Sequence, residues 1–145
     1  MTVVYLDTSA LLKRYIPEAN SDAFDAYFVE RAPFSISRLA LVEIRCALAQ
    51  RRRNKQISAE REKAAMNEIR TDIQDGVLIT YPVGDTHFAE AMHLIDKMAK
   101  VPLRSLDALH LAIAHSLEVD ELATADAVLR QAAHSLGMKV AYFGL

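Results

Sequence analysis

Two acidic residues directly follow short apolar runs of the sequence, where a carboxylate could do chemistry. Asp7 comes after VVYL, and Asp126 comes after ELATA. If both runs are neighbouring parallel strands, the two carboxylates emerge at the same edge of one sheet. An acid in this position also caps the following helix, because its oxygen accepts hydrogen bonds from free backbone N–H groups. Capping alone explains each of these two residues as well as a functional role does.

Two further acidic residues lie within helical patterns. Glu43 stands in the middle of the apolar run LALVEIRCALA, where a buried charge is costly unless it is paired or bound to a metal. A structural ion pair with Arg38 or Arg130 is the alternative to a functional role. Asp107 falls in the first turn of the helix predicted for LRSLDALHLAIAH, where the helix dipole alone favours an acid. His110 follows one turn later, and we interpret it as a hydrogen-bonded core residue rather than a ligand.

Taken together, Asp7, Glu43, Asp107 and Asp126 predict a site for a hard divalent cation, Mg²⁺ or Mn²⁺. Such ions prefer oxygen ligands and are usually held by a few carboxylates. The sequence has no Cys/His cluster with zinc spacing, no G-x-x-x-x-G-K-[ST] phosphate-binding loop and no G-x-S-x-G motif. The chemistry that remains is metal-assisted attack of water on a phosphodiester, which leaves 5′-phosphate and 3′-hydroxyl ends.

The elements that must position these acids are short apolar segments that alternate with helical patterns. Strands are predicted at Thr2–Leu6, Phe34–Ser37, Val77–Tyr81, Leu122–Thr124 and Val140–Phe143. Helices are predicted from Ser9, over Ser21–Arg31, Arg38–Arg53 and Ser58–Gln74, after a cap at Asp85 or Thr86, after a cap at Ser105, and over Ala127–Leu136. Strands separated by helices pair in parallel. We therefore expect an α/β fold, a three-layer α/β/α sandwich around a roughly five-stranded parallel sheet.

The properties of the whole chain indicate a single compact domain over residues 1–145. Hydrophobic residues make up 52% of the sequence and charged residues 25%, as in an average globular protein, and the net charge of −2 gives no sign of nucleic-acid binding. No apolar run approaches the roughly 18 residues needed to cross a membrane, and no targeting segment precedes the first strand. We expect a soluble, cytoplasmic protein. Its one cysteine, Cys46, is predicted to be a small buried hydrophobic residue.

Four sequence runs together resemble the PIN-domain family, and specifically its VapC-like toxins. They are VVYLDTSALL, SISRLALVEI, LRSLDALHLAIA and LATAD, which occur in the family's order and span nearly the whole chain. The resemblance implies an endoribonuclease whose acidic site consists of Asp7, Glu43, Asp107 and Asp126. It also implies supporting hydroxyl groups at Ser9 and Thr124.

The same resemblance implies partners that cannot be read from spacing or composition. These are an RNA substrate, a second copy of the chain in a homodimer, and a small antitoxin protein whose tail blocks the acidic pocket. The chain would then act as the toxin of a toxin–antitoxin pair, with Mg²⁺ or Mn²⁺ as its cofactor.

A basic stretch follows the helix that carries Glu43. It consists of Arg51, Arg52, Arg53 and Lys55. Such residues could bind RNA phosphates and supply an affinity that falls with salt. The alternative is a solvated helix end, where cations also suit the C-terminal end of the helix dipole. The sequence leaves these two interpretations equal.

Three other classes of protein are alternatives for this pattern of acids. A haloacid-dehalogenase phosphatase would have a second Asp two residues after Asp7, where this chain has Ser9. A response-regulator receiver would have an adjacent acidic pair near the first strand, which is absent beside Asp7. The non-enzymatic alternative is an RNA- or protein-binding module on the same scaffold. Four intact acids argue against it, because an inert scaffold has little use for a repulsive carboxylate cluster.

Overall fold

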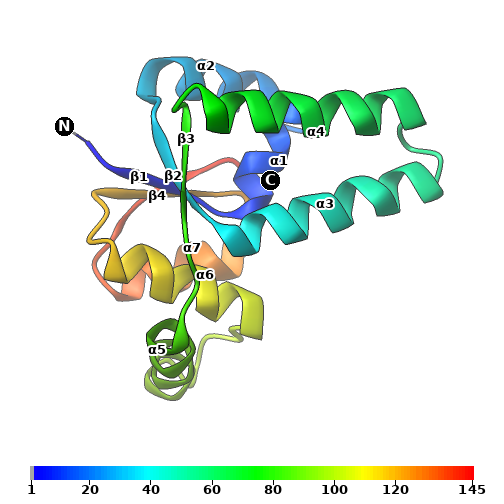
Figure 1. Ribbon diagram of the computed structural model, residues 1–145. Helices are drawn as coiled ribbons and strands as arrows, with labels where there is room; N and C mark the ends of the chain where they lie inside the picture. Colours follow the sequence, from blue (N-terminus) through cyan, green and yellow to red (C-terminus); the bar gives the residue numbers. More distant parts are fainter. Residues whose placement is uncertain (1) are drawn as a thin grey trace.

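The structure is a computed structural model that describes residues 2–145, in which one or two helices separate successive strands (Figure 1). The strands are β1 (Val4–Leu6), β2 (Phe34–Ser37), β3 (Leu78–Tyr81), β4 (Glu121–Thr124) and β5 (Lys139–Tyr142). The helices are α1 (Thr8–Tyr15), α2 (Ser21–Arg31), α3 (Arg38–Arg53), α4 (Ala59–Gln74), α5 (Asp85–Lys97), α6 (Ser105–Ser116) and α7 (Ala127–Ser135). Every predicted element is present, with bounds that differ by no more than two residues, as is usual at element ends.

The strands form one parallel sheet in the order β3-β2-β1-β4-β5. Strand β1 therefore lies at the centre, between β2 and β4. Leu6, the last residue of β1, is level with Ala123 in β4. The residues that follow β1 and β4 consequently emerge side by side at the carboxyl edge of the sheet. This is the edge at which open α/β sheets bind ligands.

Helices cover both faces of the sheet, with α1 to α4 on one side and α5 to α7 on the other (Figure 1). Because side chains alternate along a strand, Val4 and Leu6 join the core beneath α1 to α4, whereas Tyr5 between them joins the core beneath α5 to α7. The predicted three-layer sandwich with a parallel sheet is confirmed. None of the helices within residues 2–145 is long and apolar enough to span a bilayer.

The predicted caps of α5 (Asp85 or Thr86) and α6 (Ser105) are wrong by one or two residues. Gly84 is the N-cap of α5, and its backbone N–H donates to the ring of His87 at 3.0 Å, while Asp85 is already helical. Arg104 is the N-cap of α6, and its side chain makes no capping hydrogen bond. Ser105 is the first residue of that helix.

The apolar residues that mark α5 in the sequence do not face the core. Phe88, Met92 and Ile95 are 52%, 69% and 39% exposed. The face of α5 that packs in the core carries Ala91 and Leu94. The spacing predicts the helix correctly but not its buried face, because Ala91 and Leu94, each one position before Met92 and Ile95, fill that contact.

The prediction that Cys46 is buried is wrong, because its thiol is exposed. The buried face of α3 consists of Ala40, Ile44 and Leu48, which are spaced by four residues. Cys46 lies midway between two of them in the sequence and therefore points away from the core.

Candidate active site

Asp7 leaves β1 and begins α1 in a buried, fully hydrogen-bonded position. Its Oδ1 accepts a hydrogen bond from the Ala10 backbone N–H at 2.9 Å, so the residue is the N-cap of α1. Ser9 Oγ lies 2.8 Å from both carboxylate oxygens, and Thr124 Oγ1 donates to Oδ2 at 2.6 Å. Burial raises the pKa of Asp7, and the neighbouring His110 and these hydrogen bonds offset only part of that increase.

The raised pKa of Asp7 predicts how stability depends on pH in the metal-free protein. The protonated form is favoured in the folded state, so this contribution to stability is full at low pH and is lost as pH rises through the folded-state pKa. Asp7→Asn should therefore be more stable than the wild type at neutral pH, and the difference should shrink on acidification. Urea unfolding in EDTA across the acidic range measures this. If Asp7→Asn were less stable than the wild type, and more so at neutral than at acidic pH, the result would contradict this prediction.

Asp126 lies at the same edge, at the start of α7. Its Oδ1 accepts from the Leu129 backbone N–H at 2.9 Å, so this residue is also a helix N-cap. Thr124 Oγ1 links the two acids, since it donates to Asp7 and accepts from the Asp126 backbone N–H at 3.0 Å. Ser9 Oγ accepts from the Ala125 backbone N–H at 2.9 Å. The two hydroxyl groups therefore tie the end of β4 to the start of α1.

Glu43 reaches the site from the second turn of α3 and pairs with a histidine. Its Oε1 lies 2.5 Å from His110 Nε2 and accepts from Thr8 Oγ1 at 2.7 Å. His110 Nδ1 lies 2.7 Å from the Tyr5 hydroxyl. Because a carboxylate oxygen can only accept, Nε2 must carry a proton. Partial burial alone would raise the pKa of Glu43, but the hydrogen bond and charge of His110 hold it below its ordinary value.

The partner of Glu43 differs from the ones that the sequence suggested. Within residues 2–145 no ion pair joins Glu43 to Arg38 or Arg130. The Arg130 guanidinium instead lies over the ring of Tyr142, 3.9 Å from its centroid. His110 is 3% exposed and fully hydrogen-bonded, as predicted for a core residue. The sequence missed that this core histidine is itself the partner of the acid.

Asp107 lies in the first turn of α6 and shares one cation with Asp126. Arg104 Nε is 3.3 Å from Asp107 Oδ2, and Arg104 Nη2 is 3.4 Å from Asp126 Oδ2. The Arg104 side chain is 77% exposed, whereas those of Asp107 and Asp126 are 15% and 23% exposed. Arg104 therefore bridges two carboxylates at the rim of the sheet edge. No role for this arginine is predicted from the sequence.

The four predicted acids thus fall into two groups at one edge of the sheet. Asp7 is linked to Asp126 through Thr124, Asp126 to Asp107 through Arg104, and Glu43 is held by His110. As these side chains stand, no three His, Cys, Asp or Glu residues in the described part of the chain are grouped closely enough to hold a metal ion.

The donor chemistry nevertheless fits a hard cation. The acids offer oxygen ligands, and the Arg104 guanidinium stands in for a cation between Asp107 and Asp126. Two carboxylates that both face one guanidinium can both face one metal ion. Asp107 and Asp126 therefore provide part of a cation site in their present positions. Completing the site with Asp7 and Glu43 requires side-chain rotation.

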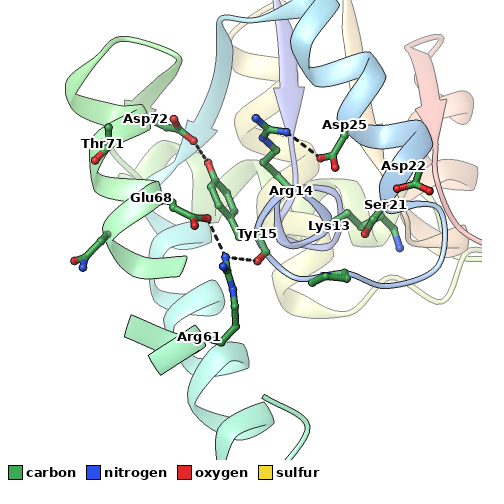
Figure 2. A pocket seen from close by; sticks show the side chains of 12 residues that line it. Lys13, Arg14, Tyr15, Ser21, Asp22, Asp25, Arg61, Glu68, Thr71 and Asp72 are labelled. Carbon is green, nitrogen blue, oxygen red and sulfur yellow. Dashed lines mark hydrogen bonds and ion pairs between the residues drawn. The ribbon is translucent and has the colours of Figure 1, made fainter. Parts of the chain in front are cut away.

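A hollow between α1, α2 and α4 lies apart from these acids (Figure 2). Its charged side chains largely compensate one another: Arg14 pairs with Asp25 at 3.1 Å, and Arg61 pairs with Glu68 at 2.9 Å. None of the four predicted acids lines it. The hollow therefore offers no second acidic centre.

Two residues of the predicted basic stretch form ion pairs with other elements of the fold. Arg51 Nη2 lies 2.8 Å from Glu18 Oε2, in the loop after α1. Arg52 Nε lies 2.5 Å from Glu62 Oε1, in the first turn of α4. Both arginines therefore tie the end of α3 to neighbouring elements.

The other two residues of the stretch, Arg53 and Lys55, are exposed and have no ion-pair partner within residues 2–145. They lie where α3 turns into α4, at the far end of this helix pair from the sheet (Figure 1). Ten residues of helix separate Arg53 from Glu43, roughly 15 Å along the axis. Any phosphate bound there lies well away from the acids.

The fold and the sheet-edge acids define a known class of protein. The family model described as PIN domain matches residues 4–135. The chain therefore belongs to the PIN-domain family. This confirms the resemblance carried by the four sequence runs.

The relatives of this chain within the family are ribonucleases of the VapC type. The chain is 33% identical over 142 residues to Ribonuclease VapC46 of Mycobacterium tuberculosis, covering 97% of each chain. It is 34% identical over 145 residues to Ribonuclease VapC45 of the same species, covering 97% of this chain and 96% of the relative.

Solved structures share the fold at lower sequence identity. Mycobacterium tuberculosis VapC20, described as a sarcin–ricin loop cleaving toxin, superposes with a TM-score of 0.70 at 16% identity, over 89% of this chain and 94% of that one. A chain of VapBC2 from Rickettsia felis, solved bound to a DNA fragment from its promoter, gives 0.69 at 10% identity, over 97% and 98%.

Proposed function

We propose that this chain is a Mg²⁺- or Mn²⁺-dependent endoribonuclease that acts as the toxin of a toxin–antitoxin pair. The observation that carries the proposal is the pair of carboxylates, Asp107 and Asp126, which face one cationic group beside the buried Asp7. The ribonuclease relatives support the choice of RNA as substrate.

In the proposed site the metal would be held by Asp7, Glu43, Asp107 and Asp126. When bound, it activates water and offsets the charge of the phosphate. Ser9 and Thr124 fix the Asp7 carboxylate in one orientation through their hydroxyl groups.

His110 and Thr8 fix Glu43 through Oε1 alone. The second oxygen, Oε2, accepts no hydrogen bond from the residues that the structure describes, and it is therefore available to orient a water molecule. Tyr5 holds the other side of the His110 ring at 2.7 Å, which keeps Nε2 directed at Glu43. Glu43 is thereby presented to the site as an ionised carboxylate in a fixed position.

The proposed partners follow from the relatives and neighbours. Several structures with this fold are toxin–antitoxin complexes, so we assign to this chain a small antitoxin protein that covers the acids. We also assign a homodimer, a single catalytic domain and action in the cytoplasm, where RNA is available.

Metal binding to the folded protein tests the proposed site directly. Because a ligand that binds only the native state stabilises it by mass action, Mn²⁺ at about 100 times its Kd should add about 2.7 kcal/mol to the free energy of unfolding. Asp107→Asn should lose most of that increase. Thermal or urea unfolding with and without Mn²⁺ measures both. Wild-type protein that binds RNA but does not respond to millimolar Mn²⁺ or Mg²⁺ would support the non-catalytic binding module instead.

A further inference from the structure

Arg104 occupies an unusual position at the proposed metal site. Its guanidinium contacts Asp107 through Nε and Asp126 through Nη2. Within residues 2–145 no other cationic side chain forms an ion pair with either acid. Arg104 is the N-cap of α6, three positions before Asp107. The start of that helix therefore fixes the position of the Arg104 backbone.

The two contacts of Arg104 compensate the charge of the acids but hold the guanidinium only weakly. At 3.3 and 3.4 Å they are longer than the usual distance between a guanidinium and a carboxylate. The side chain is 77% exposed, so water and salt screen both pairs. Without the guanidinium, two carboxylates would face each other across its place. Arg104 thus relieves repulsion between the acids, but a more highly charged ion can displace it.

We propose that Arg104 sets the metal affinity of the site by competing with the divalent ion for Asp107 and Asp126. In the metal-free protein the guanidinium lies between the two carboxylates and contacts both of them. Metal binding then requires the guanidinium to leave, and its exposed side chain has solvent into which it can move. The inference rests on the proposed function, because it assumes that Asp107 and Asp126 hold the metal.

The competition has a signature that a merely structural arginine would not produce. Arg104→Gln leaves the two acids unpaired, so the metal-free protein should melt at a slightly lower temperature. The same variant should bind Mn²⁺ more tightly, because no guanidinium has to be displaced. Two exposed ion pairs correspond to an affinity gain of about 2- to 30-fold. A purely structural arginine would instead lower the melting temperature both with and without metal.

Two further variants separate competition from general charge. Arg104→Lys keeps the charge, but one ammonium group cannot reproduce the two-nitrogen fork, so its Mn²⁺ affinity should lie between those of the wild type and Arg104→Gln. Arg130→Gln removes the same charge one turn after Asp126, from a guanidinium that rests on Tyr142 and contacts neither acid. Its Mn²⁺ affinity should change by less than about 2-fold, because the interaction acts only at a distance through solvent.

Calorimetric titration of Mn²⁺ into the full chain, without RNA, tests the inference in all four proteins. The expected order of affinity is Arg104→Gln, then Arg104→Lys, then the wild type and Arg130→Gln together. Equal affinities for Arg104→Gln and the wild type would overturn the competition and leave the metal site standing. An equal gain in Arg104→Gln and Arg130→Gln would also overturn it, in favour of a general charge effect. Absence of Mn²⁺ binding in every protein would overturn the proposed metal site itself.

Discussion

Asp107→Asn is expected to remove RNA cleavage while leaving most of the RNA binding. The substitution keeps the size of the side chain at the start of α6 but removes one of the two charges that face the cation position. Loss of one group that stabilises a charged transition state typically costs about 10²–10³-fold in turnover. Single-turnover cleavage of a labelled RNA at saturating enzyme measures this loss, and gel-shift titration measures the binding.

The matched control for this variant is Asp96→Asn. Asp96 is exposed on α5, and the substitution makes the same chemical change on a helix that carries none of the four acids. Its cleavage rate should equal that of the wild type. If Asp107→Asn were folded and cleaved RNA at the wild-type rate, Asp107 would have no part in the chemistry. A parallel loss of binding and cleavage would assign it to RNA binding instead.

Replacing Arg53 and Lys55 together by Ala is expected to weaken RNA binding and to flatten its dependence on salt. Both side chains are exposed at the end of α3, without ion-pair partners in the described part of the chain. Each phosphate contact to single-stranded RNA contributes about 0.7 to the slope of log affinity against log salt, so the double variant should lose about 1.4. Turnover at saturating RNA should change little, because contacts equal in ground and transition states affect only binding.

The matched comparison is the double variant Arg51→Ala with Arg52→Ala, which removes the same number of charges from the same helix end. These two residues hold Glu18 and Glu62, so their loss should lower the free energy of unfolding as well as any RNA affinity. An unchanged salt slope in folded Arg53 and Lys55 variants would assign the stretch to a solvated helix end. The acidic site would survive that result.

The position of Asp7 and Asp126 at one sheet edge could be predicted, because it follows from strand order and parallel pairing. Each of Asp7 and Asp126 follows an apolar strand, and parallel pairing brings both to one edge, with Leu6 level with Ala123. Capping and a functional role do not exclude each other at these residues, because each carboxylate caps its helix with Oδ1 and leaves Oδ2 for other partners.

Two contacts of the site could not be predicted, because they join residues far apart in the sequence. Glu43 and His110 are 67 positions apart, and no spacing rule relates α3 to α6. The contact of Arg104 with Asp107 is a local one, three residues along a helix, and was visible in the sequence as RSLD. Its contact with Asp126 depends on the loop before α6 meeting the end of β4, which only the folded chain determines.

We expect that water, rather than the ribose 2′-hydroxyl, attacks the phosphodiester, with the acids of this sheet edge holding the metal. Attack by water leaves a 5′-phosphate and a 3′-hydroxyl. Attack by the 2′-hydroxyl leaves a cyclic phosphate and usually employs His as acid or base. The two routes therefore differ in products that can be identified directly.

The most direct measurement is the chemistry of the RNA ends after cleavage by the purified chain, in Mn²⁺ and in EDTA. We expect fragments with 5′-phosphate and 3′-hydroxyl ends in Mn²⁺ and no cleavage in EDTA, with an Asp7→Asn preparation inactive in both. Cyclic-phosphate ends, or undiminished cleavage in EDTA, would contradict the account and would transfer the chemistry to a histidine, with His110 as the first candidate.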